Sequence, residues 1–407
     1  MRISSVTMFE KSTASMNRQQ SDFLRVSQQI ASGRRVVNPS DDPQAAARAV
    51  GVDQSMAINE QYTNSRVSAR NSLAQTESVL NSVSDAVTRA KTLLIQASSD
   101  TLSDADRQSI SSELKGVYET LIGQANATDG NGRYLFGGYK DDAPPFFKND
   151  SGKVEYRGDA SAREQQVDAS RRMPVAENGR SIFQSVASNA SYIAKANPDN
   201  TGNVTFAGLS VKDSSDANFG ASFTVRFEEN TAGEGFVYRV EGPEGELTNG
   251  AYTGDGQQIA FGGVSLTLTG TPEVGDEISV ARAGSAEQPA DLFKTLEAVI
   301  GVLENPAETD AEKAALRNTL NTSMRELDNA LDNVLTVRAS AGARLNELDV
   351  IDAVGSNRMM NYAQTLSDLV DLDYAEAISE YSLRQVGLQA SQRTFVEMKS
   401  MSLFNYM

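Results

Sequence analysis

The sequence predicts a mainly α-helical protein into which a β-rich domain is inserted. Both ends of the 407-residue chain carry long apolar stripes whose members recur every three or four residues, which is the spacing of a coiled-coil seam. The middle differs, because 20 of the 30 glycines and 7 of the 10 prolines fall in residues 134–290. Glycine and proline are poor in helix interiors and mark turns. We therefore expect one long antiparallel helical bundle, built from both ends of the chain, with an antiparallel β domain inserted between them.

The first long helix is predicted to begin at Pro43 and to run to about Ser99. Residues 38–42, Asn-Pro-Ser-Asp-Asp, precede it and supply the capping side chains that are typical of a helix start. A shorter helix is predicted after the capping-box pattern of residues 103–106, and the Asp-Gly-Asn-Gly run at 129–132 ends it. The apolar stripe of the long helix consists of Ala69, Leu73, Thr76, Leu80, Val83, Val87, Ala90, Leu94 and Ala97.

A matching stripe lies near the other end of the chain, after a second capping-box pattern at residues 309–312. Arg338 interrupts this stripe, but its methylene stem can cover the seam while its guanidinium reaches solvent. Two stripes of this length predict that residues 39–133 and 291–365 pair as one helical bundle domain. The members of the second stripe are Leu320, Met324, Leu327, Leu331, Val334, Arg338, Ala341, Leu345 and Leu348.

The middle region, residues 134–290, is predicted to form the inserted β-rich outer domain. Turn residues, including Asn249-Gly250 and residues 254–256, separate its strand-like runs. Residues 181–194 are an exception, since their apolar periodicity predicts one helix. The predicted strands are residues 153–156, 204–211, 222–227, 236–240, 259–268 and 277–280.

The two extreme ends, residues 1–38 and 366–407, share a sparser pattern with one large apolar side chain in every seven residues. Such a stripe is narrower than the apolar face of a helix that is stable alone. We therefore predict that these terminal coiled-coil segments pair with each other or with other chains, and that their apolar stripes form an assembly interface. The eight residues of this predicted interface are Phe9, Met16, Phe23, Ile30, Tyr374, Tyr381, Leu388 and Phe395.

Composition excludes several classes of function. The formal net charge is −17, whereas a nucleic-acid binder or a protein that docks on anionic membranes needs basic surface. The chain has no histidine and no cysteine, so it has no Ser-His-Asp triad, imidazole-ligated zinc, thiol nucleophile or disulfide. No stretch approaches the roughly 20 apolar residues of a membrane span, and the polar N-terminus lacks the apolar core of a cleavable secretory signal.

Three patterns resemble chemical sites, and each has a simpler explanation. Arg34-Arg35 with Asp41-Asp42 suggests a phosphate or metal site, but acidic residues before a helix are expected to cap it. The acidic run between Asp368 and Glu380 lacks the ligand spacing of a calcium loop. Paired carboxylates could hydrolyse glycosides, but with 54 acidic residues some pair lies at any separation. We therefore predict no catalytic residues, no metal site and no cofactor, and a scaffold rather than an enzyme.

Stretches that occur in a matching order near both ends resemble the bacterial flagellin superfamily and, within it, proteins of the hook–filament junction. They cover most of residues 1–140 and 291–407. The stretches are residues 1–4 (MRIS), 32–43 (SGRRVVNPSDDP), 128–138 (TDGNGRYLFGG), 335–339 (LTVRA), 345–348 (LNEL), 388–391 (LQAS) and 402–404 (SLF).

The resemblance implies a structural, extracellular protein of the flagellum that serves in motility. It implies export through the flagellar type III apparatus without a cleavable signal, and a cytosolic export chaperone. It further implies assembly between another hook-associated protein on the hook side and flagellin on the filament side, with head-to-tail self-assembly into a helical layer through the terminal helices. Two alternatives stay open: a flagellin that builds the filament itself and, from another class, a secreted carbohydrate-active enzyme.

Overall fold

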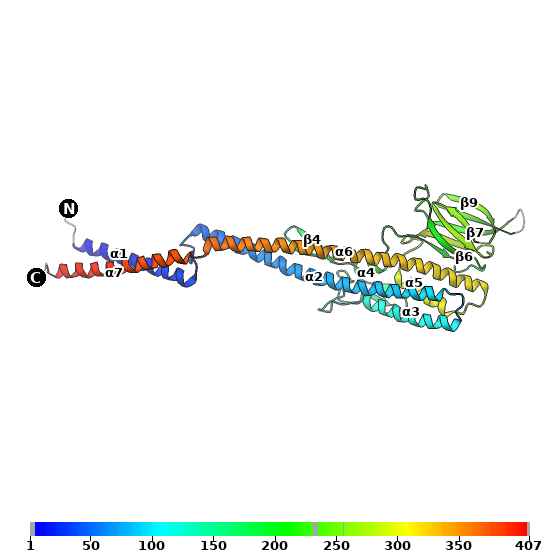
Figure 1. The fold of residues 1–407 in the computed structure, drawn as a ribbon, viewed down its shortest axis with the longest axis horizontal. Helices are drawn as coiled ribbons and strands as arrows, with labels where there is room; N and C mark the ends of the chain where they lie inside the picture. Colours follow the sequence, from blue (N-terminus) through cyan, green and yellow to red (C-terminus); the bar gives the residue numbers. More distant parts are fainter. Residues whose placement is uncertain (1–4, 231–234, 255, 405–407) are drawn as a thin grey trace. The chain divides into compact units, whose positions relative to one another are not determined.

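The fold is mainly α-helical at both ends of the chain, with antiparallel sheets in the middle, as predicted (Figure 1). The structure is a computed structural model and describes residues 5–230, 235–254 and 256–404. Its helices are α1 (Ser5–Ser32), α2 (Pro43–Ala97), α3 (Asp104–Ala125), α4 (Gly179–Phe183), α5 (Leu292–Glu304), α6 (Asp310–Val370) and α7 (Tyr374–Phe404).

The strands all lie between α3 and α5, and every pairing between them is antiparallel. They are β1 (Phe146–Lys148), β2 (Val154–Tyr156), β3 (Arg163–Asp168), β4 (Arg171–Ala176), β5 (Tyr192–Ala196), β6 (Thr205–Val211), β7 (Phe223–Glu229), β8 (Phe236–Gly242), β9 (Gly245–Tyr252), β10 (Gln257–Phe261), β11 (Val264–Thr269) and β12 (Glu277–Arg282).

The chain divides into two compact units, residues 1–64 with 350–407 and residues 65–349. The long helices α2 and α6 each contribute to both units. The first unit holds the terminal helices α1 and α7. The second holds α3, α4, α5 and all the strands. The sequence predicts three domains, and this division stays a prediction about which segments fold together. The predicted domains are residues 1–38 with 366–407, residues 39–133 with 291–365, and residues 134–290.

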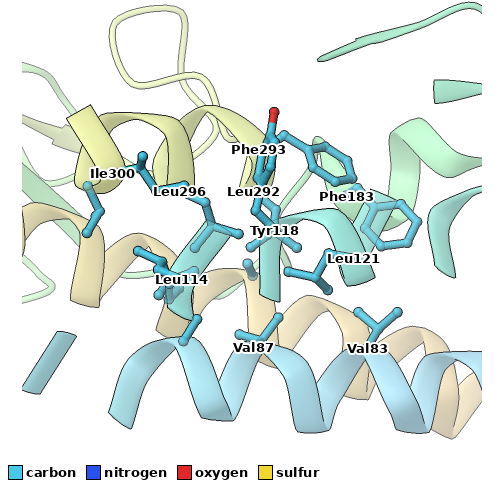
Figure 2. Close-up of a cluster of buried hydrophobic side chains, with 14 of the residues drawn as sticks. Val83, Val87, Leu114, Tyr118, Leu121, Phe183, Leu292, Phe293, Leu296 and Ile300 are labelled. Carbon is cyan, nitrogen blue, oxygen red and sulfur yellow. The ribbon is translucent and has the colours of Figure 1, made fainter. Parts of the chain in front are cut away.

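The apolar stripe of α2 is buried as the 3–4 spacing predicts. All nine members from Ala69 to Ala97 are at most 1 % exposed. Figure 2 shows Val83 and Val87 facing the apolar side chains of α3, among them Leu114 and Leu121. Burial of one face along this length is what holds so long a helix in place, because helix propensity alone is a weak contribution.

The stripe of α6 is buried in a graded way. One residue in every seven is buried, and the four members between these are half-buried. The buried members are Leu320, Leu327, Val334, Ala341 and Leu348. The Arg338 side chain is half-buried, and its Nε lies 3.7 Å from a carboxylate oxygen of Glu77. The guanidinium of Arg338 therefore meets a charge on α2 at the seam, while its stem stays within the stripe.

Aromatic side chains from the middle of the chain complete the helical core. Phe146 lies 5.3 Å from Phe183 and 5.1 Å from Phe293, measured between ring centroids. Phe136 packs edge-on against Phe183 at 5.8 Å. Figure 2 shows Phe183 next to Phe293, the second residue of α5. The segment up to Phe183 therefore contributes to the core of the helices rather than to a separate β core.

The remaining strands, β5 to β12, form a sandwich with its own core. One sheet has the order β5-β12-β7-β8-β9, and the other has the order β10-β11-β6. Alternate residues of β7, namely Phe223, Val225 and Phe227, are at most 2 % exposed, as expected for a strand with one buried face. They pack in one cluster with Phe206 and Leu266 of the other sheet.

Three local predictions for the middle region are wrong. Residues 181–194 are not one helix, because α4 ends at Phe183 and β5 begins at Tyr192. Residues 249 and 250 are not a turn, because both lie inside β9, which pairs with β8 through Arg239–Asn249 and Tyr238–Gly250. In both places pairing with a distant or neighbouring strand overrides the local signal. Residues 259–268 are not one strand, because β10 ends at Phe261 and β11 begins at Val264, and the two strands pair as a hairpin.

Both predicted capping boxes are confirmed. The Ser103 hydroxyl accepts a hydrogen bond from the backbone N–H of Asp106, and the Asp106 carboxylate accepts one from the backbone N–H of Ser103. At the start of α6 the Thr309 hydroxyl accepts from the Glu312 N–H at 3.2 Å, and the Glu312 carboxylate accepts from the Thr309 N–H at 2.8 Å. These reciprocal bonds satisfy donors that a helix N-terminus leaves unpaired.

Candidate assembly surface on the terminal helices

Four of the eight apolar residues predicted at the chain ends form ring pairs between α1 and α7. We call the eight residues the terminal seam. The rings of Phe9 and Phe395 are 5.2 Å apart between centroids, and those of Phe23 and Tyr381 are 4.9 Å apart. The two helices therefore pair with each other inside one chain. The sequence had left open whether they pair with each other or with other chains.

The ring pairs also determine the register of the two helices. From Phe9 to Phe23 the chain advances fourteen residues along α1, and from Phe395 to Tyr381 it goes back fourteen along α7. The helices are therefore antiparallel, and the seven-residue repeat places Met16 opposite Leu388 and Ile30 opposite Tyr374.

The terminal seam is only partly shielded by this pairing. Two members of the seam are exposed, Phe9 by 49 % and Tyr374 by 52 %. The other six are half-buried, namely Met16, Phe23, Ile30, Tyr381, Leu388 and Phe395. An ion pair supports the contact: Arg384 Nη1 lies 3.1 Å from a carboxylate oxygen of Asp22, and Arg384 Nη2 lies 3.1 Å from a carboxylate oxygen of Glu380 on the same helix. Exposed pairs of this kind contribute at most about 1 kcal/mol each.

A clamp centred on Arg35 joins the loop after α1 to the end of α6. The backbone N–H of Arg35 donates to the carbonyl of Val370 at 2.7 Å, and its Nη2 donates to the carbonyl of Leu369 at 2.7 Å. Its Nη1 donates to Asp42 at 3.2 Å. One residue thus ties together the connection from α1 to α2 and the connection from α6 to α7.

Gly33 is required where the two connections touch. Its φ is +69°, a left-handed conformation that other residues adopt at a cost. A Cβ atom at this position would lie 3.0 Å from the hydroxyl oxygen of Tyr374. The carbonyl of Gly33 accepts a hydrogen bond from the N–H of Leu372 at 3.1 Å. The Ser-Gly-Arg-Arg motif therefore serves a close backbone approach rather than an anion site.

The acids of the same motif organise the start of α2, as predicted. Asp42 accepts a hydrogen bond from the backbone N–H of Ala45 at 3.0 Å, and Asp41 accepts from the N–H groups of Val37 and Asn38. The Ala45 amide, and after it the Arg35 guanidinium, hold the pKa of the Asp42 carboxyl below its ordinary value.

This pKa shift predicts an acid-sensitive clamp. Because the folded-state pKa of Asp42 is lowered, its stabilising contribution is full above the unfolded value of about 4 and is lost as the pH falls through the folded-state pKa. We expect Asp42→Ala to lower the thermal midpoint of unfolding at pH 7. The difference in thermal midpoint between this variant and the parent protein should disappear below about pH 4. Asp53→Ala, at an exposed carboxylate of α2, is the control. A gap of the same size at every pH would contradict the prediction.

The acidic run between Asp368 and Glu380 is used for local hydrogen bonds. Asp373 accepts from the N–H groups of Ala375 and Glu376 at the start of α7, and Asp371 accepts from the Ser367 hydroxyl. Among residues 5–230, 235–254 and 256–404 no group of three or more acidic side chains is arranged to hold a metal ion. In that same part of the chain, no helix is long and apolar enough to cross a membrane.

The structure adds a second apolar surface that the sequence reasoning missed. Leu383 is 72 % exposed and Val386 is 64 % exposed on α7. Each lies two residues from a seam position, Tyr381 or Leu388, which is about 200° around a helix and so on the side away from α1. The signal was present in the sequence as large apolar residues off the seven-residue repeat. We call Leu383 and Val386 the outer patch of α7.

Known proteins resemble this chain over its whole length. The family model of the bacterial flagellin N-terminal helical region matches residues 3–141. Flagellar hook-associated protein 3 of Escherichia coli is 34 % identical over 405 residues, which cover 99 % of this chain and 99 % of that protein. Polar flagellin C of Vibrio parahaemolyticus is 23 % identical and covers 95 % of this chain and 93 % of its own.

A solved structure agrees with these relatives. The crystal structure of Xanthomonas campestris FlgL is 30 % identical, covers 78 % of this chain and 99 % of its own chain, and superposes with a TM-score of 0.68. The resemblance to the flagellin superfamily that the sequence predicts is thereby confirmed.

Proposed function

This chain belongs to the flagellar hook-associated protein 3 family, and on that premise we propose that it is a structural subunit at the junction between the hook and the filament of the bacterial flagellum. The observation that carries the proposal is the match over 99 % of both chains at 34 % identity. It extends through both helical ends and the middle of the chain, so the whole architecture is shared rather than one domain.

The terminal helices supply the proposed means of assembly. They pair with each other along the terminal seam, yet they leave Phe9, Tyr374 and the outer patch of α7 exposed. Large exposed apolar side chains on one segment are typical of a surface that meets other proteins. Neighbouring subunits in a helical layer would cover these faces through a heterologous, head-to-tail contact.

The proposed partners and location follow from the family. Another hook-associated protein would lie on the hook side and flagellin on the filament side, and copies of this chain would contact one another within the layer. The protein would reach this extracellular place through the flagellar type III apparatus, without a cleavable signal, after release from a cytosolic export chaperone. The role is structural and not enzymatic, consistent with a chain that lacks histidine and cysteine.

Flagellin is the second candidate, and one specific difference separates it from a junction protein. A flagellin polymerises with itself into long filaments, whereas a junction layer ends where its two neighbours begin. Polar flagellin C matches at 23 % identity and the Escherichia coli hook-associated protein 3 at 34 %, so the junction role is favoured.

Electron microscopy of cells that lack the protein tests the proposed function. We expect hooks that carry no attached filament and flagellin released into the medium, and we expect the parent gene to restore filaments. Wild-type filaments on the deletion strain would overturn the junction role. Long homopolymers formed by the purified chain alone would favour a flagellin instead.

A further inference from the structure

The β sandwich has a core that is separate from the core of the helices. The sandwich cluster contains Val225, Val240 and Val280 and takes in none of the apolar side chains of α2, α3, α5 or α6. The helical cluster likewise ends at Phe183 before the chain enters the sandwich and resumes at Leu292 after it. Whatever holds the sandwich against α6 is therefore not a continuous apolar core.

Five polar side chains on one face of α6 hold the sandwich; we call them the edge latch, and they are Asn318, Asn321, Thr322, Arg325 and Asn329. All of them bond to backbone atoms of the sandwich or of the segment that leads into it. Asn318 donates to the carbonyl of Val204 at 2.8 Å and accepts from the N–H of Phe206 at 3.1 Å. Asn321 donates to the carbonyl of Phe206 at 2.8 Å.

The other members reach further along the two sheet edges. Thr322 donates to the carbonyl of Ala194 at 2.7 Å, and Arg325 donates to the carbonyl of Leu209 at 2.9 Å. Asn329 accepts from the N–H of Ser191 at 3.1 Å. In the described part of the chain β6 pairs only with β11 and β5 only with β12, so the edge latch covers the open edges of both sheets.

Cavities flank this row of hydrogen bonds on both sides. One, of about 270 Å³, is lined by Lys195, Asn200, Asn318, Thr322 and Glu326 among others. A second, of about 280 Å³, is lined by Ala194, Phe206, Leu209, Asn321 and Arg325 among others. Each has room for several water molecules beside polar groups. Water can therefore replace the bonds of the edge latch one by one, so that each contributes only a small net free energy.

The chain enters and leaves the sandwich at one place. The strands next to the two connections, β5 and β12, pair with each other through Tyr192–Arg282 and Ile193–Ala281. Gly284, in the outgoing connection, has φ +81°, and a Cβ atom there would lie 2.7 Å from Val186 in the incoming one. The two connections thus run side by side.

We propose that the β sandwich is a hinged module that pivots at residues 184–191 and 283–291 between a latched state, held to α6 by the edge latch, and an open state in which water solvates the edges of β5 and β6. The two cores stay intact in both states, because the two clusters of buried apolar side chains share no residue. This inference does not depend on the proposed function, since it concerns the sandwich and not the terminal helices.

Pulsed electron spin resonance on the full chain tests the hinge. The chain has no cysteine, so nitroxide labels at Gln108→Cys on α3 and Lys212→Cys on the sandwich, both exposed, report one distance. We expect one narrow distance distribution for the parent. The triple variant Asn318→Ala, Thr322→Val and Arg325→Met removes four bonds of the edge latch. We expect it to raise the ratio of open to latched molecules at least about thirtyfold and to show a second distance.

The control makes the same three kinds of change on the exposed face of α6: Asn346→Ala, Thr336→Val and Arg317→Met. It should keep the parent distribution. Amide exchange of β7 and β8 in both variants reports whether the sandwich is still folded. An unchanged single distance in the latch variant would overturn the proposal. So would a second distance that appears with loss of protection in β7 and β8, or one that the control also shows.

Discussion

Leu80→Asp is expected to cause the largest loss of stability of any single change in the helical core. Leu80 is 0 % exposed in the stripe of α2. Removing the leucine side chain costs about 2–5 kcal/mol, and an unpaired carboxylate left in the seam adds more. The sum approaches the total stability of about 5–15 kcal/mol that is usual for a folded protein. Circular dichroism should show the thermal midpoint falling by 10 °C or more, at about 2–4 °C per kcal/mol.

Two further substitutions calibrate this result. Ile95→Asp places the same charge on the same helix at a side chain that is 62 % exposed, so its midpoint should stay close to that of the parent. Leu331→Asp changes the facing stripe at a half-buried position and should have an intermediate effect. If the Leu80→Asp and Ile95→Asp variants had the same thermal midpoint, the buried seam between α2 and its partners would be disproved.

Leu383→Asp combined with Val386→Asp is expected to abolish filament attachment while leaving the fold unchanged. Both side chains belong to the outer patch of α7, so neither contributes to the contact with α1. A neighbouring subunit that covered this patch would have to bury two carboxylates without partners, each at a cost of several kcal/mol. Complementation of the deletion strain with this variant should give hooks without filaments, as scored by electron microscopy and swimming assays.

The matched control adds the same two charges to exposed apolar residues of the sandwich. Val211 is 49 % exposed and Val274 is 63 % exposed. Val211→Asp combined with Val274→Asp should restore filaments, and both double variants should melt like the parent. Normal filaments with the outer-patch variant would show that α7 meets no neighbour on that side. A lower melting temperature would show that the loss of filaments came from misfolding.

Long helices could be predicted from the sequence because their signals are local and repeated. The stripe from Ala69 to Ala97 contains nine members, and a single exception would not have hidden its 3–4 spacing. The capping boxes at Ser103 and Thr309 place two helix starts within one residue of those observed. Each of these signals lies within a few residues of the structure that it determines.

The middle region could be predicted only in part, since its structure depends on distant residues. Residues 181–194 carry helical periodicity, but Asn333 of α6 donates to the carbonyls of Ser181 and Ile182, and β12 pairs with the segment from Tyr192 onward. The hairpin of β3 and β4 escaped prediction for a similar reason: the buried Arg66 of α2 donates to the carbonyl of Val167 in β3. No short sequence pattern predicts a partner that lies so far away along the chain.

The eight residues of the terminal seam stay a prediction as an assembly interface, and the sequence alone did not determine how the terminal helices pair. Two ring pairs of the seven-residue repeat, Phe9 with Phe395 and Phe23 with Tyr381, lie between α1 and α7, and antiparallel pairing accounts for their spacing. The repeat alone could not say whether the partner of Phe23 would be Tyr381 of the same chain or a residue of another chain. The repeat also does not include Leu383 and Val386, because both lie between the positions that recur every seven residues.

The pairing of Phe9 with Phe395 has a consequence for how the protein is made. Phe9 and Phe395 are separated by almost the full length of the chain, so α1 is synthesised long before α7. At about 5–20 residues per second, translation of the intervening chain takes on the order of 20–80 s. Throughout that time α1 has no partner, and a broad apolar face would invite aggregation. The predicted stripe of α1 has only one large apolar side chain in seven, which limits the apolar surface that α1 exposes during that time.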